Sequence, residues 1–237
     1  MSVVLILGSA PDVVACQDWD LSLFSEIVVI NNAWRVREDW TILIHPEDFP
    51  EDRRPGALRD GQRIVTAADY VPAQNALGGF VYAGGTMAFT AGYWVLHALA
   101  PKAVAYFGCD MVYAPQGNTH FYGTGAADPL RADVTLRSLE AKATRLQALA
   151  ARQGCALVNL STNESRLTFP RATLDGLSRH VPAPVPVNEA VLSAALSREA
   201  ELGYFVESGR YWDRQADFDT GQIDALDALW RGAMAAG

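Results

Sequence analysis

The chain has 237 residues, of which 50% are hydrophobic, and it carries a formal net charge of -8. This length and composition suffice for a well-buried core, which excludes a disordered chain. The acidic balance, with a pI near 4.9, gives no broad cationic field of the kind that attracts phosphate backbones or anionic lipid. We therefore expect no nucleic-acid partner.

The cysteines and the beginning of the chain bear on the compartment. Cys16, Cys109 and Cys155 are widely spaced in apolar runs, where a thiol usually behaves as a small core residue, so a reducing compartment fits best. No basic segment precedes the first apolar run, and no uninterrupted apolar stretch has membrane-spanning length. We expect a cytoplasmic protein without a transmembrane segment.

Short apolar runs rich in β-branched residues recur along the chain and predict buried parallel strands. These runs are residues 3–7, 27–30, 41–44, 103–107 and 156–160, with 63–66 as an additional candidate. The runs at 103–107 and 156–160 each follow a helix-like stretch. This alternation predicts a Rossmann-like, doubly wound α/β fold with a mainly parallel sheet.

Two helices are predicted before the last two strands. The first covers 85–99 and ends before Pro101. The second covers 133–153, where Asp133 can cap the start and a glycine follows the end. Apolar residues mark one face of this second helix, and charges occupy the other, as expected of a helix that lies on a sheet.

A proline-dense segment, His180 to Pro186, cannot continue a helix or a central strand and suggests a boundary. We expect residues 1–180 to form a Rossmann-like domain and residues 187–237 a helical C-terminal extension. Its helices are predicted at 187–202 and 221–235. Their apolar faces require a partner surface, either on the domain or on another copy in a homo-oligomer.

The residues after each strand are the first candidates for a site, because parallel sheets bind ligands beyond the carboxyl ends of their strands. After the first strand, Gly8 and Ser9 begin a turn of small residues that lets backbone N–H groups approach an anion. Pro11 can then open a helix. A plain tight turn is the alternative.

The next two strands also end in polar groups. Asn31 and Asn32 close the second strand, where a carboxamide can read a nucleobase edge or a ribose hydroxyl, or simply cap a helix. After the third strand, His45 stands beside Glu47 and Asp48, a group able to serve acid–base or metal chemistry. A solvated acidic loop explains this group equally well.

Three further positions follow the same logic. Gly85 and Thr86 precede a predicted helix, whose N–H groups and dipole can hold a phosphate or carboxylate, although an ordinary N-cap has the same appearance. Asp110 follows the strand at 103–107 and can orient a ribose or hold a divalent ion. Ser161 belongs to a polar cluster after the last strand that can read a base, or make local turn hydrogen bonds.

The loop at 111–129 is unusually long and carries several aromatic residues, among them Tyr113. Loops of this length in compact domains are usually lids or binding loops, and the aromatic content argues against disorder. His120 within it can act as a general base or acid, or serve structure alone. The sequence has no P-loop, no zinc-spaced cysteine or histidine cluster and no GxSxG elbow, which disfavours those chemistries.

Taken in order, five short motifs resemble the bacterial lipooligosaccharide sialyltransferase family and its hydroxymethylpterin pyrophosphokinase-like relatives. The motifs are Leu5–Pro11, Ile30–Asn32, Gly84–Thr86, Gly108–Asp110 and His120–Gly123. The similarity spans roughly residues 3 to 170, so it implies that the domain at residues 1–180 is a nucleotide-binding catalytic domain. It implies that a CMP-sugar is held by Gly8, Ser9, Asn31, Gly85 and Thr86. It also implies that Tyr113 assists the departing phosphate.

One position departs from the family. Thr124 stands where the family has its catalytic histidine, and a threonine cannot accept a proton at neutral pH. The resemblance thus implies a glycosyltransferase with a nucleotide-sugar donor and a small-molecule or glycan acceptor, needing no cofactor, with His120 and Asp110 as catalytic candidates. The alternatives are a Mg²⁺-dependent pyrophosphokinase-like enzyme in which Asp110 binds the metal, and a nucleotide-binding protein without catalysis.

Overall fold

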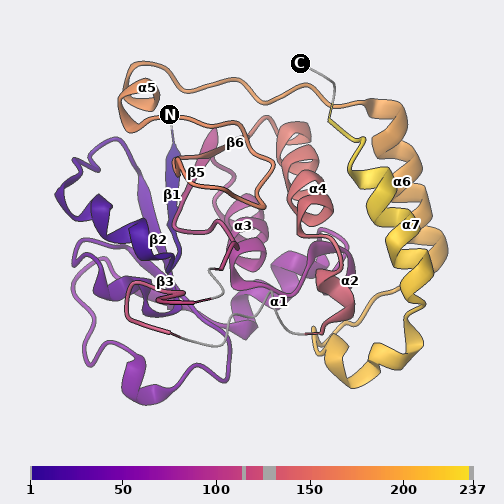
Figure 1. Cartoon of the computed structure of the whole chain (residues 1–237), viewed down its shortest axis with the longest axis horizontal. Coiled ribbons are helices and arrows are strands. Elements are labelled where there is room, and N and C mark those ends of the chain that lie inside the picture. Colours follow the sequence, from indigo (N-terminus) through magenta and orange to yellow (C-terminus); the bar gives the residue numbers. More distant parts are fainter. Residues whose placement is uncertain (1, 114–115, 125–131, 235–237) are drawn as a thin grey trace.

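A six-stranded, wholly parallel sheet lies at the centre of the molecule (Figure 1), in a computed structural model that describes residues 2–113, 116–124 and 132–234. The strands are β1 (Val3–Leu7), β2 (Glu26–Ile30), β3 (Ile42–Ile44), β4 (Arg63–Val65), β5 (Ala103–Phe107) and β6 (Ala156–Asn159). Their order across the sheet is β4-β3-β2-β1-β5-β6. This arrangement confirms the predicted Rossmann-like α/β fold and the additional strand at 63–65.

The side chains of each strand alternate between two buried layers. In β1, Val4 and Ile6 belong to the larger apolar cluster, and Leu5 and Leu7 belong to the smaller one on the opposite face. Every residue of β1 is buried. Burial on both faces is the reason that the sequence shows continuous apolar runs in place of polar alternation.

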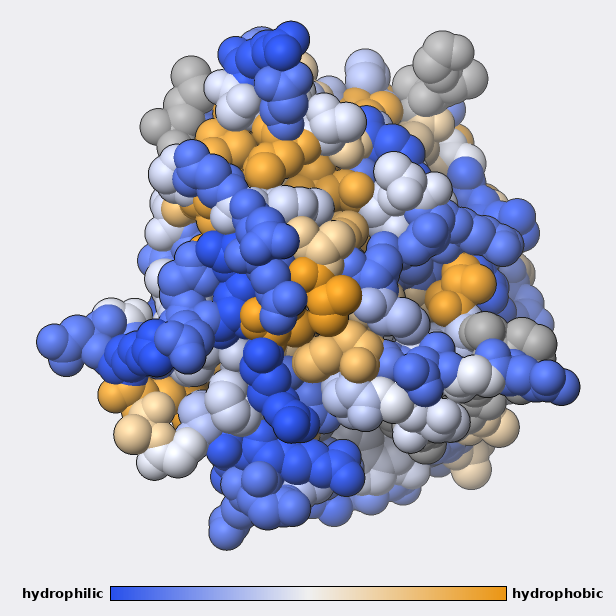
Figure 2. All heavy atoms as spheres, turned by 60° about the vertical axis from the view of Figure 1, so that its left-hand side comes forward, coloured by the Kyte–Doolittle hydropathy of each residue, from blue (hydrophilic) through white to orange (hydrophobic). Residues whose placement is uncertain are grey.

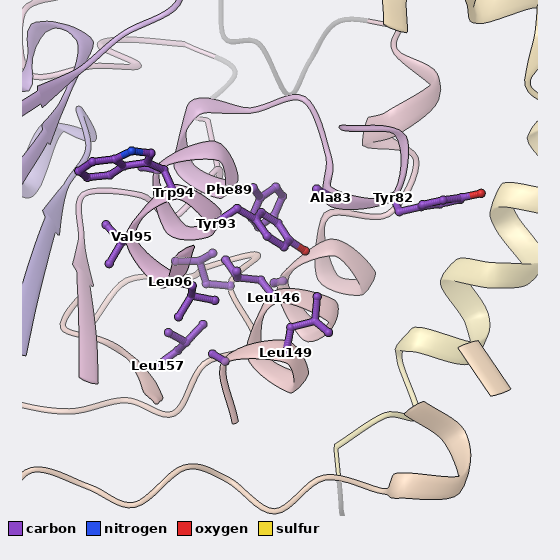
Figure 3. Packing of buried hydrophobic residues seen from close by; sticks show 14 of the residues in the cluster. Tyr82, Ala83, Phe89, Tyr93, Trp94, Val95, Leu96, Leu146, Leu149 and Leu157 are labelled. Carbon is purple, nitrogen blue, oxygen red and sulfur yellow. The ribbon is translucent and has the colours of Figure 1, made fainter. Parts of the chain in front are cut away.

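Helices cover the larger cluster. The α-helices of the molecule are α1 (Ala67–Asn75), α2 (Phe80–Ala83), α3 (Met87–Ala98), α4 (Leu139–Arg152), α5 (Leu174–Arg179), α6 (Glu189–Leu202) and α7 (Thr220–Trp230). Figure 3 shows Phe89 and Leu96 of α3 near Leu146 and Leu149 of α4, with Leu157 of β6 close by. α3 and α4 therefore close one face of the sheet.

The opposite face is covered mainly by shorter elements. A 3-10 helix at Pro11–Asp18 contributes Val13 and Cys16 to the smaller cluster, and the short α5 contributes Leu177. Pro11 opens its helix as expected. A second 3-10 helix at Asn31–Arg35 follows β2. Figure 2 shows a mostly hydrophilic surface toward this side of the molecule, with apolar residues in separate patches.

The predicted helix at 133–153 is two elements. Asp133 caps a 3-10 turn by accepting a hydrogen bond from Thr135, and Ser138 separately caps α4 by accepting one from Ala141. The prediction of one continuous helix was wrong because a second capping side chain lies inside the range, and each cap fixes a non-helical backbone at its own position.

The charged face of α4 also differs from a solvated helix surface. Lys142 and Arg145 are fully buried, with 0% and 1% of their side chains exposed. Lys142 pairs with Asp227 at 2.7 Å, and Arg145 pairs with Glu199 at 2.7 Å. The C-terminal helices cover this face and supply both carboxylates, so the charges of α4 hold α6 and α7 in place.

The C-terminal extension thus packs on the rest of the chain (Figure 1). Residues 181–186 form an extended connection without helix or strand, and α6 and α7 follow it. Trp230 of α7 is completely buried and donates a hydrogen bond from Nε1 to Glu199 at 2.8 Å. Among the described residues, no helix combines the length and apolar character that crossing a membrane requires.

Candidate functional site

A cavity of about 150 Å³ opens at the carboxyl end of the sheet. It lies where the strand order reverses between β1 and β5, the switch point at which α/β sheets commonly bind ligands. The predicted site residues that line it are Gly8, Ser9, Asn31, Thr86, Tyr113 and His120. Residues far apart in the chain therefore meet around one space.

The turn after β1 forms one wall and packs tightly against the turn after β5. Gly8 donates its N–H to the carbonyl of Phe107 at 2.8 Å, and Ala10 donates to Gly108 at 3.0 Å. A Cβ atom on Gly8 would lie 2.2 Å from the carbonyl oxygen of Gly108. Glycine is required at position 8 because two backbones approach each other there.

Replacing Gly8 by alanine should therefore destabilise the protein by about 1–3 kcal/mol, since the contact that would have to yield is backbone. The free energy of unfolding measured in urea would show the loss. Gly56→Ala is the matched control, because a Cβ at Gly56 meets no atom within 4 Å, and it should change stability by less than about 0.5 kcal/mol. Equal stabilities for the two variants would contradict the packing argument.

Asn31 forms a second wall in an unusual backbone conformation. Its φ is 51°, in the left-handed region that asparagine tolerates better than most residues. Its Oδ1 is buried and has no hydrogen-bond partner among the described residues. A buried acceptor without a partner is costly, so this oxygen is suited to receive a donor from a ligand in the cavity.

The N-terminus of α3 forms a third wall. Thr86 is the N-cap, accepting a hydrogen bond from Phe89, and the next two residues, Met87 and Ala88, also line the cavity. Free N–H groups at a helix N-terminus, together with the helix dipole, favour an anion. Thr86 thus stands at a helix N-terminus that borders the cavity, the position on which its predicted anion role depends.

Gly85 lies outside the cavity lining. Its N–H is bound by Thr135 Oγ1 at 2.9 Å, and a Cβ placed on it would lie 2.0 Å from the hydroxyl oxygen of Tyr211. Tyr211 in turn donates a hydrogen bond to Asp133 at 2.7 Å. The C-terminal extension thus fills the space beside Gly85, which serves close packing in this structure.

The loop that carries His120 closes the cavity from the side. Its described part is tied to the turn after β1, because the N–H of Phe121 donates to the carbonyl of Ser9 at 3.0 Å. The rest of the predicted loop, 114–115 and 125–129, lies outside the described residues. His120 is 8% exposed and Thr119 Oγ1 lies 2.9 Å from its Nδ1. These contacts fix the position of the imidazole.

Aromatic rings surround the imidazole. Tyr122 stacks on His120 with a centroid distance of 5.0 Å, and the ring of Tyr113 lies 5.9 Å away. Thr124 is exposed and hydrogen-bonds within its own loop, to Gly117 at 3.3 Å, and it does not line the cavity. Histidine at position 120, and not the residue at position 124, therefore lines the cavity.

Asp110 lies next to the cavity without lining it. Its side chain is buried, and Oδ1 accepts a hydrogen bond from Asn159 at 3.0 Å. Ser161 is also buried outside the lining, where its N–H binds Asn159 Oδ1 and its hydroxyl accepts from Asn163. Ser161 thus makes the local turn contacts that were the alternative to base recognition.

His45 and Asn32 are likewise buried away from the cavity. Nδ1 of His45 lies 2.8 Å from the carbonyl of Pro46, and its ring packs against Phe49. Asn32 is 3% exposed with Oδ1 unpartnered among the described residues. Both residues follow a strand, as the cavity residues do, but their side chains do not line the cavity. Side chains of neighbouring residues point in different directions at a strand end.

Sequence reasoning missed several lining residues. Ile30, Cys109, Met111 and Tyr122 all line the cavity. Burial raises the pKa of the Cys109 thiol well above its ordinary value, so it stays protonated and contributes packing. Ile30, Cys109 and Met111 lie at or just after the end of a predicted strand, and this position could have identified them as candidates.

The fold and the site together define an α/β protein of Rossmann-like topology with a preformed cavity at its switch point. No family model, curated protein or solved structure matches this chain. Among the described residues, no group of three or more histidine, cysteine, aspartate or glutamate side chains could hold a metal ion. The function is therefore argued from the geometry of the cavity.

Proposed function

We propose that this protein is a glycosyltransferase that uses a nucleotide-sugar donor. The observation that carries the proposal is the single cavity shared by the turn after β1, Asn31, the start of α3 and His120. It combines an anion site, a buried acceptor and a histidine within one space, and these are the groups that a nucleotide-sugar and its transfer require.

Each wall has a part in binding the donor. The N-terminus of α3 at Thr86 holds a phosphate, because its N–H groups and dipole favour negative charge. Oδ1 of Asn31 accepts a hydrogen bond from the base or the ribose. The described cavity, at about 150 Å³, is smaller than the usual binding pocket for a whole ligand. The rest of the donor extends past the exposed Tyr122 at the rim.

His120 removes the proton from the acceptor hydroxyl as the bond to the sugar forms. Its low exposure and its contacts with Thr119 and Tyr122 hold it at the cavity wall. Tyr113 lies on the same wall, in reach of a departing phosphate. In the sialyltransferases that this chain resembles, the base is a histidine at the place that matches Thr124. Thr124 hydrogen-bonds within its own loop, so His120 takes the role of the base in this protein.

Thermal unfolding with CMP, UDP, GDP, ADP and ATP, each with and without Mg²⁺, tests the nucleotide class. A ligand at about 100 times its Kd should stabilise the native state by about 2.7 kcal/mol, which raises the unfolding temperature. We expect stabilisation by CMP, UDP or GDP. Stabilisation by ATP with Mg²⁺ alone would favour pyrophosphoryl transfer, and no shift with any nucleotide would contradict the proposal.

Asn31→Asp should abolish the stabilisation. Aspartate keeps the size of the side chain, an acceptor oxygen and the tolerance of the left-handed backbone, but it adds a negative charge that repels the phosphates of the donor. Asn188→Asp is the matched control, because Asn188 is an exposed N-cap of α6 and aspartate caps helices equally well. Incubation with the matching nucleotide-sugar then separates an enzyme, which releases the nucleotide, from a binding protein, which leaves the donor intact.

A further inference from the structure

Two carboxylates that sequence reasoning did not join lie beside the cavity. Asp12 is in the first turn of the 3-10 helix that follows β1, and Asp110 follows β5. β1 and β5 are neighbours in the sheet. The negative charge of Asp110 contributes to raising the pKa of Asp12, after the larger effect of burial, so the two carboxylates are within electrostatic reach of each other.

Each carboxylate is oriented by an asparagine from the end of β6 or just after it. Asn163 Nδ2 donates to Oδ2 of Asp12 at 2.8 Å, and Asn159 Nδ2 donates to Oδ1 of Asp110 at 3.0 Å. The second oxygen of each, Oδ1 of Asp12 and Oδ2 of Asp110, is buried and has no hydrogen-bond partner among the described residues. The Asp110 side chain is only 5% exposed.

The negative charges of Asp12 and Asp110 are only partly compensated by nearby positive charge. Of the described residues, only Arg171 has a charged nitrogen within 4 Å of either carboxylate, 3.9 Å from Oδ1 of Asp110. That guanidinium also donates to the carbonyl oxygens of Ser161 and Asn163. Two carboxylates with one distant cation leave an uncompensated negative charge in a largely buried place, which is costly unless another cation or a proton joins them.

We propose that Asp12 and Asp110 together bind a divalent cation of the Mg²⁺ type. Mg²⁺ is commonly held by one or two carboxylates and keeps several of its waters, whereas structural zinc sites take four protein ligands of the histidine, cysteine or carboxylate kind. Two carboxylates that are oriented by asparagines fit the magnesium pattern. The zinc pattern needs a larger group of ligands, and none is found among the described residues.

The cation lies next to the cavity. Asp12 belongs to the same turn as Ala10, and both neighbours of Asp110, Cys109 and Met111, line the cavity. A bound divalent ion would therefore raise the positive potential beside the proposed nucleotide. The binding of the ion does not rest on the proposed function, because its two ligands lie outside the cavity lining.

Titration with Mn²⁺ alone, followed by electron paramagnetic resonance of the free ion in the absence of nucleotide, tests the site. The wild-type protein should bind one Mn²⁺ that Mg²⁺ displaces. Asp12→Asn and Asp110→Asn should each weaken binding at least about 10-fold. Asp60→Asn, at an exposed acid with no hydrogen bond or ion pair among the contacts between described residues, should bind as the wild type does.

Asparagine at position 110 retains an oxygen to accept the hydrogen bond from Asn159, and Asp12 is only partly buried, so both variants should fold. Near-ultraviolet circular dichroism checks that both variants are folded. If Asp110→Asn is unfolded, the loss of Mn²⁺ binding in Asp12→Asn alone tests the site. A wild-type Kd weaker than about 1 mM, or binding that neither variant weakens, would overturn the proposal in favour of a proton shared between the carboxylates. Failure of nucleotide binding would leave this result unaffected.

Discussion

His120→Gln should lower the rate of the proposed glycosyl transfer at least about 100-fold, the usual contribution of a general base. Glutamine preserves the size and hydrogen bonding of the side chain but cannot accept a proton at neutral pH. Nucleotide binding should persist, because the proposed contacts with the phosphate and the base come from other walls of the cavity, at Thr86 and Asn31. A large effect on turnover with a small effect on binding would assign chemistry to His120.

The measurement is release of free nucleotide from the donor, with water as acceptor where no glycan acceptor is known. His97→Gln is the matched control because His97 is exposed on α3, away from the cavity lining. Both variants should unfold at the wild-type temperature within a few degrees. If His120→Gln and His97→Gln turn over donor equally fast, His120 is not the base.

Arg145→Ala should destabilise the protein by about 3–5 kcal/mol, the range observed when one partner of a buried ion pair is removed. The guanidinium binds both oxygens of Glu199 at 2.7 and 2.8 Å. It also donates to the hydroxyl of Tyr93 and to the carbonyl of Leu77 at 2.7 Å each. The alanine variant leaves the Glu199 carboxylate buried with Trp230 as its remaining side-chain donor among the described residues.

Urea unfolding measures this loss, and Arg137→Ala provides the control. Arg137 pairs with Asp224 at 2.5 Å, but the two side chains are 40% and 49% exposed, so removing the arginine should cost no more than about 1 kcal/mol. The double variant Arg145→Met/Glu199→Leu should recover most of the stability, because buried ion pairs can often be replaced by apolar side chains of similar size. A loss below about 1 kcal/mol for Arg145→Ala would contradict the assignment.

Local sequence patterns determined the sheet and several walls of the cavity. The apolar runs of β1, β2 and β5 predicted buried strands because a central parallel strand must be apolar on both faces. The cap at Thr86 was predicted from its place before a helix, because helix capping depends on neighbours in the chain. The glycine turn at Gly8 was predicted from its place after a strand, although the backbone that it approaches, at Gly108, is distant in the chain.

Tertiary structure decided which of the predicted site residues meet. Gly8, Asn31, Thr86 and His120 converge on one cavity. Gly85 does not belong to that cavity, because Tyr211, from a segment that follows α6, occupies the space beside it. No local pattern reports a contact of this kind, since the two residues are brought together only by the path of the C-terminal extension.

The sequence by itself determined the strands of the sheet, their order along the chain and the small residues in the turns that follow β1 and β5. Only the tertiary structure decided that Lys142 and Arg145 are buried, and that Asp12 and Asp110 come within electrostatic reach of each other. Arg145 meets its partner 54 residues away and Lys142 meets its own 85 residues away. Helix and strand signals come from the nearest neighbours in the chain, whereas burial of a charge depends on a distant partner whose position follows from the whole fold.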